Sequence, residues 1–168
     1  MISQALFRHI HSQYALSPTG IHGPAHWERV RENGTRLAAA TGANLQIVEL
    51  FAYLHDACRQ SDGRDHDHGP RAAALVRSLH GALIHLPAVD LELLAYACAY
   101  HTRGLIEADV TVQTCWDADR LDLGRIGIRP EPTRLCTPAA RDPVVIEWGW
   151  AHSQGRQEPC PLPLAPFS

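Results

Sequence analysis

The stretch NLQIVELFAYLHDAC, residues 44–58, decides the expected fold. Asn44 can cap a helix at the start of this stretch. The apolar residues that follow keep the three-and-four spacing of a buried helix face, at Ile47, Leu50, Phe51, Leu54 and Cys58. His55 and Asp56 adjoin this face near the end of the helix. Burial of an imidazole and a carboxylate is unfavourable unless something compensates their polarity, and a divalent cation compensates both at once.

Helical signals extend on both sides of this stretch, and no convincing run of alternating residues predicts a strand. Pro and Gly begin and end several segments, and Asp90 and Asp109 can cap two of them. The expected helices cover residues 2–15, 24 to about 40, the stretch after Asn44, about 69–80, the stretch after Asp90 and the stretch after Asp109, with a polar loop at 59–67.

The character of the chain changes beyond Gly124, because eight of the twelve prolines lie after residue 129. One further short helix is expected around residues 144–151, and the last segment, PCPLPLAPFS, cannot be helical. We therefore predict an all-α fold in a single domain, a helical bundle over residues 1–152. Residues 153–168 are expected to form an extended Pro-rich tail.

Composition narrows the classes of function. A formal net charge of −3 gives no reason to expect binding to polymeric nucleic acid. All 15 basic residues are Arg, so a Schiff-base lysine and a Walker-type phosphate loop are excluded. Arginine suits phosphate recognition, although a biased genomic base composition would produce the same excess.

Cysteine usage and the N-terminus bear on location. The five Cys form no C-x-x-C pair, and their odd number without a disulfide framework indicates a reducing compartment. Cys58, Cys98 and Cys115 lie among apolar residues and are expected to be buried free thiols. The N-terminal segment is neither a signal peptide nor long enough to span a membrane. A cytoplasmic protein without a membrane partner is expected.

The His55–Asp56 pair has counterparts on other expected helices. His26 lies in the first turn of one helix, His101 at the end of another and Asp119 near the end of a third. An isolated His-Asp pair often serves only as a hydrogen-bonded helix end. Several helices that present such ligands inward are, however, how helical bundles build metal sites.

This order of H, HD, H and D resembles the HD-domain superfamily of metal-dependent phosphohydrolases. Five segments between about residues 20 and 125 carry the resemblance, namely His22-Gly-Pro-Ala-His26-Trp-Glu-Arg-Val30, Leu54-His55-Asp56, Asp65-His-Asp-His68-Gly-Pro-Arg-Ala-Ala73, Tyr100-His101-Thr-Arg-Gly104 and Trp116-Asp-Ala-Asp119-Arg-Leu-Asp122. They follow one another in the family's order. The resemblance implies an HD-type helical bundle.

The resemblance also implies the metal ligands, which are His26, His55, Asp56 and Asp119 for one ion, with His68 and His101 added for a second ion that Asp56 bridges. His68 is favoured over His66 because it directly precedes Gly69-Pro70 at a helix start, and His66 stays as the alternative. The implied cofactor is one or two divalent transition-metal ions, of Mn, Fe, Ni, Co or Zn.

The implied activity is cleavage of a phosphate ester or anhydride in a nucleotide or another small phosphorylated metabolite, with hydroxide formed at the metal as nucleophile. Asp56, His68 and His101 are the expected catalytic residues. Arginines beside the motifs are candidates for phosphate binding, namely Arg59, Arg71, Arg103 and Arg120.

Other branches stay open. Residues 57–60 lack the acidic side chains that nucleotidases and (p)ppGpp hydrolases of the family carry soon after HD, which disfavours those two branches. Two-iron oxygenases have the same ligand letters, but the short spans between the motifs favour a hydrolase. A non-catalytic module that binds a metal or a nucleotide is a third interpretation. The sequence gives no indication of the oligomeric state.

Overall fold

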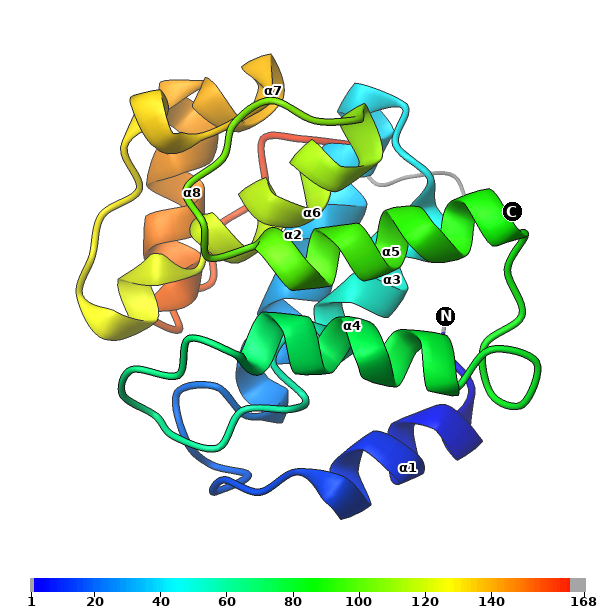
Figure 1. Cartoon of the computed structure of the whole chain (residues 1–168). Helices are drawn as coiled ribbons and strands as arrows, with labels where there is room; N and C mark the ends of the chain where they lie inside the picture. The colour runs from blue at the N-terminus through cyan, green and yellow to red at the C-terminus, as the bar shows by residue number, and fades with distance from the viewer. Residues whose placement is uncertain (1, 164–168) are drawn as a thin grey trace.

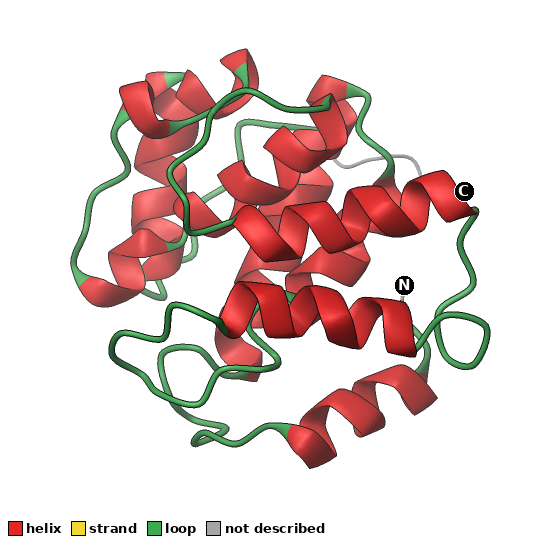
Figure 2. Ribbon diagram, in the orientation of Figure 1, coloured by secondary structure: helices red, strands yellow, loops and turns green. Residues whose placement is uncertain are grey.

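The structure is a computed structural model that describes residues 2–163. Over that range it is helical, and its only β feature is an isolated bridge between His80 and Ile84, so the predicted all-α fold is confirmed (Figure 2). The α-helices are α1 (Gln4–Gln13), α2 (Pro24–Thr41), α3 (Leu45–Leu54), α4 (His68–Ser78), α5 (Ala88–Tyr100), α6 (Val110–Arg120), α7 (Pro138–Arg141) and α8 (Pro143–Ser153), with 3-10 helices η1 (Leu123–Ile126) and η2 (Pro132–Arg134).

Five helices, α2 to α6, form the centre of the molecule. Helix α2 packs against α3 and α6, and α5 packs against α4, α3 and α6. Helix α1 lies at one edge, and α7 and α8 lie at another (Figure 1). The largest fully buried side chains include Trp27, Phe51, Leu54, Leu94 and Trp116. None of the helices within residues 2–163 is long and apolar enough to cross a membrane.

Helix α3 begins as predicted, because the Asn44 side chain accepts hydrogen bonds from the backbone N–H groups of Gln46 and Ile47. The helix ends at Leu54, and residues 55–58 form a turn. Cys58 therefore leaves the buried face and is partly exposed, so its expected burial is wrong, whereas Cys98 and Cys115 are buried as predicted. The end of α3 places His55 and Asp56 where the chain changes direction.

Helix α5 begins earlier than predicted. Its first residue is Ala88, after the extended Pro87, so the assignment of Asp90 as its cap is wrong. Asp90 lies in the first turn, where a negative charge is favourable, and accepts a hydrogen bond from the Asn44 side chain at 3.2 Å. This contact joins the N-terminal ends of α3 and α5. The predicted cap of α6, Asp109, is confirmed by its hydrogen bond from the N–H of Thr111.

Two glycines allow helices to approach closely. A Cβ atom at Gly69 would lie 2.8 Å from the carbonyl oxygens of both Cys98 and Ala99, so only glycine lets the start of α4 touch the end of α5. A Cβ atom at Gly34 of α2 would overlap the side chain of Val48 on α3. The first of these contacts brings the residue before Gly69, His68, next to the residues that follow α5.

The Pro-rich region is fixed to the bundle by a buried carboxylate. Asp117 of α6 accepts hydrogen bonds from the N–H groups of Cys136 and Thr137 and from the Thr137 hydroxyl, at 2.7 to 2.8 Å. The short helix expected around 144–151 is confirmed as α8. Residues 154–163 of the predicted tail contain no helix, and residues 164–168 lie outside the described residues. The boundary between domain and tail stays a prediction.

Candidate metal centre

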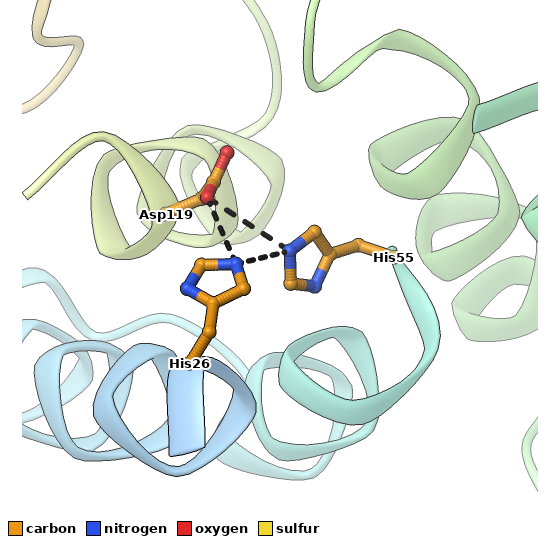
Figure 3. Close-up of side chains that lie close together, drawn as sticks. All are labelled: His26, His55 and Asp119. Atoms are coloured by element: carbon orange, nitrogen blue, oxygen red, sulfur yellow. Dashed lines mark hydrogen bonds and ion pairs between the residues drawn. The ribbon is translucent and has the colours of Figure 1, made fainter. Parts of the chain in front are cut away.

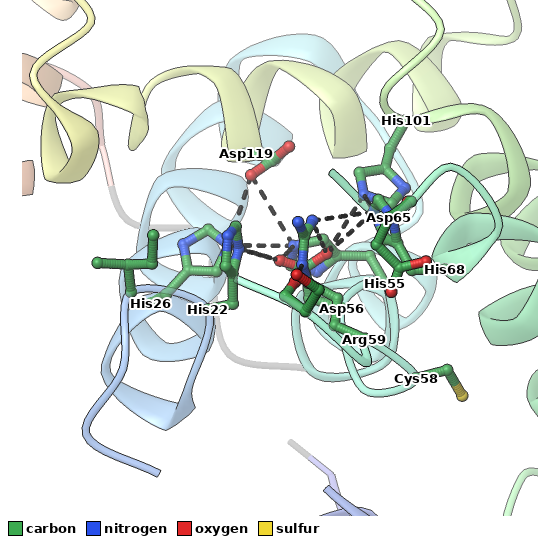
Figure 4. A network of polar contacts seen from close by, with 12 residues as sticks. His22, His26, His55, Asp56, Cys58, Arg59, Asp65, His68, His101 and Asp119 are labelled. Carbon is green, nitrogen blue, oxygen red and sulfur yellow. Dashed lines mark hydrogen bonds and ion pairs between the residues drawn. The ribbon is translucent and has the colours of Figure 1, made fainter. Parts of the chain in front are cut away.

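Six residues from five helices converge in one buried cluster (Figure 4). They all stand at helix ends, with His26 in the first turn of α2, His55 and Asp56 just after α3, His68 at the start of α4, His101 just after α5 and Asp119 in the last turn of α6. The C-terminal ends of three helices thus face the cluster, where their partial negative charge favours a cation, while the N-terminal ends of α2 and α4 act in the opposite direction.

One part of the cluster consists of His26, His55 and Asp119 and is called the Asp119 half below. The Nε2 atoms of His26 and His55 lie 3.1 Å apart. Oδ1 of Asp119 lies 3.5 Å from the first and 3.8 Å from the second of these nitrogens (Figure 3). Three ligand atoms therefore surround one small volume, as a metal site requires.

The other part consists of His68 and His101 and is called the His68 half. Their Nε2 atoms lie 3.0 Å apart. Asp56 stands between the halves, since its Oδ1 is 3.3 Å from Nε2 of His68 and 3.5 Å from that of His101. Its Oδ2 is 3.8 Å from the Nε2 atoms of both His26 and His55. One carboxylate oxygen faces each half, which is the placement of a bridging ligand.

The backbone fixes the tautomer of three of these histidines. Nδ1 of His55 faces the carbonyls of Phe51 and Ala52 at 3.1 Å, Nδ1 of His101 faces that of Cys98 at 2.8 Å, and Nδ1 of His68 faces that of Asp65. A carbonyl only accepts hydrogen bonds, so each Nδ1 carries the proton and a neutral ring has its lone pair on Nε2. The carboxylate of Asp122 does the same for His26, whose Nδ1 lies 2.6 Å away.

The result is a cluster with more acceptors than donors, in which Arg59 reaches Nε2 of His68 and His22 reaches Oδ2 of Asp56. Oδ1 of Asp56 and Oδ1 of Asp119 are buried and have no hydrogen-bond partner in the described part of the chain. Four nitrogen lone pairs point at each other and at these oxygens. Such an arrangement is unfavourable by itself, and a divalent cation resolves it. The residues therefore fit one or two transition-metal ions.

Protonation states agree with this fit. Burial lowers the pKa of His26 well below its usual value, lowers that of His55, and lowers that of His68 to about 4. Burial would raise the pKa of the two carboxyls, but the neighbouring histidines, His55 foremost, hold that of Asp56 well below its usual range and that of Asp119 at about 2. Neutral imidazole and ionised carboxylate are the forms that bind metal.

His101 is the exception to this pattern. Its burial favours the neutral ring, but its contact with the Asp56 carboxylate outweighs burial and raises its pKa. A cation bound between the two side chains would replace that proton.

Two buried residues support the ligands from behind. His22, which sequence analysis did not assign as a ligand, lies with Nδ1 2.8 Å from Oδ2 of Asp56. Asp122, which was not singled out, binds His26 and accepts a hydrogen bond from Nε of Arg29 at 2.6 Å. Its signal in the sequence is its position three residues after Asp119, within the closing motif.

The four candidate arginines differ in placement. Arg59 is buried, with Nη1 3.5 Å from Oδ1 of Asp56. Arg71 donates to the Asp65 carboxylate and to the carbonyl of Cys58, and Arg103 is exposed on the surface groove between α4 and α5. Arg120 donates to the carbonyls of Leu105 and Arg134. The positions of Arg71 and Arg103 give no support to their assignment as phosphate-binding residues.

Sequence reasoning missed a further arginine of the site, Arg125. Its Nη1 lies 3.8 Å from Oδ1 of Asp119, and its Nε donates to the carbonyl of Ile21. His66, the alternative to His68, is exposed on the loop, whereas His68 is buried.

A cavity of about 470 Å³ adjoins the cluster at His101 and Asp119. Other lining residues come from η1 and the Pro-rich region after it, with apolar Leu123, Ile128 and Leu135 and the arginines Arg129 and Arg134. Arg129 pairs with Glu147, and Arg134, whose side chain is 80% exposed, pairs with Glu131 at 3.4 Å. The cluster is thus reached through a cavity with apolar walls and cationic side chains.

No protein-family model and no curated protein matches the chain. Among solved structures it is similar to a predicted HD superfamily hydrolase from an uncultured Thermotogales bacterium, with a TM-score of 0.70, 21% identity, and coverage of 90% of this chain and 87% of the other. It is also similar to a Lactobacillus plantarum protein, with a TM-score of 0.50, 22% identity, and coverage of 96% and 68%. The resemblance seen in the motifs is confirmed at the level of the fold, and the chain has the all-helical fold of the HD superfamily.

Proposed function

We propose that this chain is a metal-dependent phosphohydrolase that cleaves a phosphate ester or anhydride of a small metabolite, such as a nucleotide. The convergence of four histidine lone pairs with the Asp56 and Asp119 oxygens carries the proposal. A divalent ion held there would lower the pKa of a bound water molecule and neutralise charge on phosphoryl oxygens.

Hydrogen bonds within the chain hold the candidate ligands in fixed orientations. Carbonyl contacts at Nδ1 hold three imidazoles in one orientation, and Asp122 holds the fourth. His22 contacts Oδ2 of Asp56 and so orients the carboxylate that lies between the halves. Because these groups are buried, their interactions are stronger than they would be in water.

The adjoining cavity supports an anionic substrate with an apolar part. Its volume of about 470 Å³ lies in the usual range for small-molecule sites. Arg134 has an exposed side chain whose ion pair, to Glu131 at 3.4 Å, is also exposed, so it can turn to a second anionic group, whereas Arg120 donates to the carbonyls of Leu105 and Arg134. We infer that phosphate contacts come from the Pro-rich region and that Arg120 shapes the cavity.

The decisive experiment combines metal analysis with a reaction screen. Protein purified without oxygen would be assayed for bound metal. The metal-free form, resupplied with Mn, Co, Ni, Fe or Zn, would be tested for phosphate release from nucleotides, dinucleoside polyphosphates and phosphomonoesters. We expect release without oxygen from the wild type and from His85→Ala, whose side chain is exposed, and none from His55→Ala.

The other possible results distinguish the alternative functions. Oxygen consumption coupled to substrate loss, without phosphate release, would identify a two-iron oxygenase. Firm metal binding without turnover in the whole screen would favour the non-catalytic module. Equal metal content in wild type and His55→Ala would refute the assigned centre.

A further inference from the structure

Arg59 is the one arginine of the described residues that contacts a histidine ligand nitrogen. The residue is 7% exposed, and its guanidinium donates through Nε to the carbonyl of Ser61 and through Nη2 to that of Gly63. The third nitrogen, Nη1, lies 3.3 Å from Nε2 of His68 (Figure 4). Two backbone contacts therefore aim the remaining N–H groups at the His68 half.

The loop that carries Arg59 is itself braced. The Asp65 carboxylate accepts a hydrogen bond from the N–H of Gln60 at 2.8 Å and pairs with Arg71. The carbonyl of Asp65 accepts the proton on Nδ1 of His68. Arg59 and His68 thus belong to one hydrogen-bonded loop. Backbone contacts at both residues hold their side chains in place.

The hydrogen bond from Arg59 occupies Nε2 of His68, which is the atom that would bind a metal ion. Since Nδ1 of His68 carries the proton, Nε2 offers only a lone pair, and Nη1 of Arg59 donates into it. An ion bound to that lone pair must displace this hydrogen bond. It would also lie close to a permanent positive charge, because arginine is not deprotonated in proteins.

No such competition occurs in the Asp119 half. Arg125, the nearest cation there, faces the carboxylates of Asp119 and Asp122 at 3.7 to 3.8 Å. Arg125 thus faces two carboxylates and no ligand nitrogen, although Asp122 is shared with Arg29, whereas Arg59 has, among the described residues, only the shared Asp56 carboxylate beside it, at 3.5 Å. The two halves therefore offer similar nitrogens in different electrostatic surroundings.

We propose that Arg59 makes the centre unequal, so that one ion binds tightly in the Asp119 half and a second binds weakly in the His68 half, because it must displace the Arg59 guanidinium from His68. Arg59 then sets the metal concentration at which the centre becomes binuclear. This inference rests on the metal centre of the proposed function, but its test needs no substrate.

The test is a titration of metal-free protein with Mn²⁺, followed through the spin-resonance signal of the free ion, with elemental analysis after gel filtration. Wild type should bind one ion at least about tenfold more tightly than the second, since a unit charge a few ångströms away weighs heavily on a divalent ion. In Arg59→Gln and Arg59→Met the second ion should bind at least about tenfold more tightly than in wild type.

Two controls separate charge at the ligand from other effects. Arg64→Gln removes an exposed arginine of the same loop and should leave both affinities at the wild-type values. The double variant Arg59→Gln/His68→Ala should lose the second ion, which would place that ion in the His68 half. Thermal unfolding of each variant checks that the loop and the bundle are intact.

Several results would overturn the inference. Two ions of equal affinity in wild type would do so even if both Arg59 variants failed to fold. So would folded Arg59 variants whose second ion binds no more tightly, or a second ion that survives in the double variant. Absence of any metal binding would refute the proposed function as well, while equal binding of two ions together with phosphate release would refute the role of Arg59 alone.

Discussion

The Asp119 half and the His68 half each contain two histidines whose Nε2 atoms lie about 3 Å apart, yet the groups behind those histidines differ. Behind His26 stands the carboxylate of Asp122, and Asp119 adds a second negative charge. Behind His68 and His101 stand neutral backbone carbonyls, with Arg59 in front. Identical ligand types therefore need not give equal sites, because neighbouring charges decide how strongly each half attracts a cation.

The halves also differ in how the fold assembles them. The Asp119 half is built from α2, α3 and α6, which pack on one another in the centre of the bundle. The His68 half depends on the contact of α4 with the end of α5, which only the missing side chain of Gly69 permits. We therefore expect the His68 half to be the more easily disturbed, and the following variants test this.

The largest effect is expected from Asp56→Ala, because this carboxylate faces both halves. Both ions should be lost, and phosphate release should fall by about a thousandfold or more, since metal catalysis contributes several kcal/mol to lowering the barrier. Elemental analysis and a phosphate assay measure the two effects. Asp62→Ala, an exposed carboxylate of the nearby loop, should change neither quantity. Retention of the first ion by Asp56→Ala would show that Asp56 does not hold it.

The next effect is expected from Asp122→Asn. It weakens the acceptor at Nδ1 of His26, and loss of such a supporting group lowers metal affinity by about 10- to 100-fold. The loss should fall on the tight ion and leave the weak one nearly unchanged. Arg29→Gln is the matched control. Arg29 also binds Asp122 but leaves the contact of that carboxylate with His26 in place, so the affinity of the tight ion should change less than in Asp122→Asn. A metal titration in which Asp122→Asn weakened both ions equally would contradict the division into halves.

A smaller effect, on the second ion instead of the first, is expected from Gly69→Ala. The added methyl group would press on the Cys98 and Ala99 carbonyls, move α4 away from α5 and separate His68 from His101. The second ion should bind more weakly and the first as before, with a loss of stability of about 1–3 kcal/mol from overpacking. Gly34→Ala, which crowds Val48 instead, should lower the unfolding temperature without changing the second ion. Equal effects of both substitutions on the second ion would refute the special role of the α4–α5 contact.

The smallest effect is expected from Arg134→Gln in the cavity wall. An exposed ion pair contributes about 0.2–1 kcal/mol, so KM for an anionic substrate should rise at most about fivefold while kcat and metal content stay unchanged. Steady-state kinetics at two salt concentrations measures this, and the difference should shrink at high salt. Arg8→Gln, on the exposed side of α1, should have no effect. A fall in kcat would instead place Arg134 close to the reacting group.

The sequence by itself determined the helices and which residue types stand at their ends. The Asn44 and Asp109 caps and the buried face of α3 follow from local hydrogen bonding and spacing. The ordered motifs named six candidate ligands, and all six meet in the cluster. The same local rules failed at Asp90 and Cys58, where a helix began earlier or ended earlier than the pattern indicated.

The tertiary structure alone decided what surrounds those ligands. Asp122 reaches His26 across 96 positions of the chain, and His68 meets His101 across 33, so no local pattern reports either contact. The direction of each Nε2 lone pair depends on which acceptor faces Nδ1, and the position of Arg59 depends on the path of the loop through Ser61 and Gly63. These features set the electrostatics of the centre, because Coulomb interactions depend on distances in space, which the packing of the helices fixes.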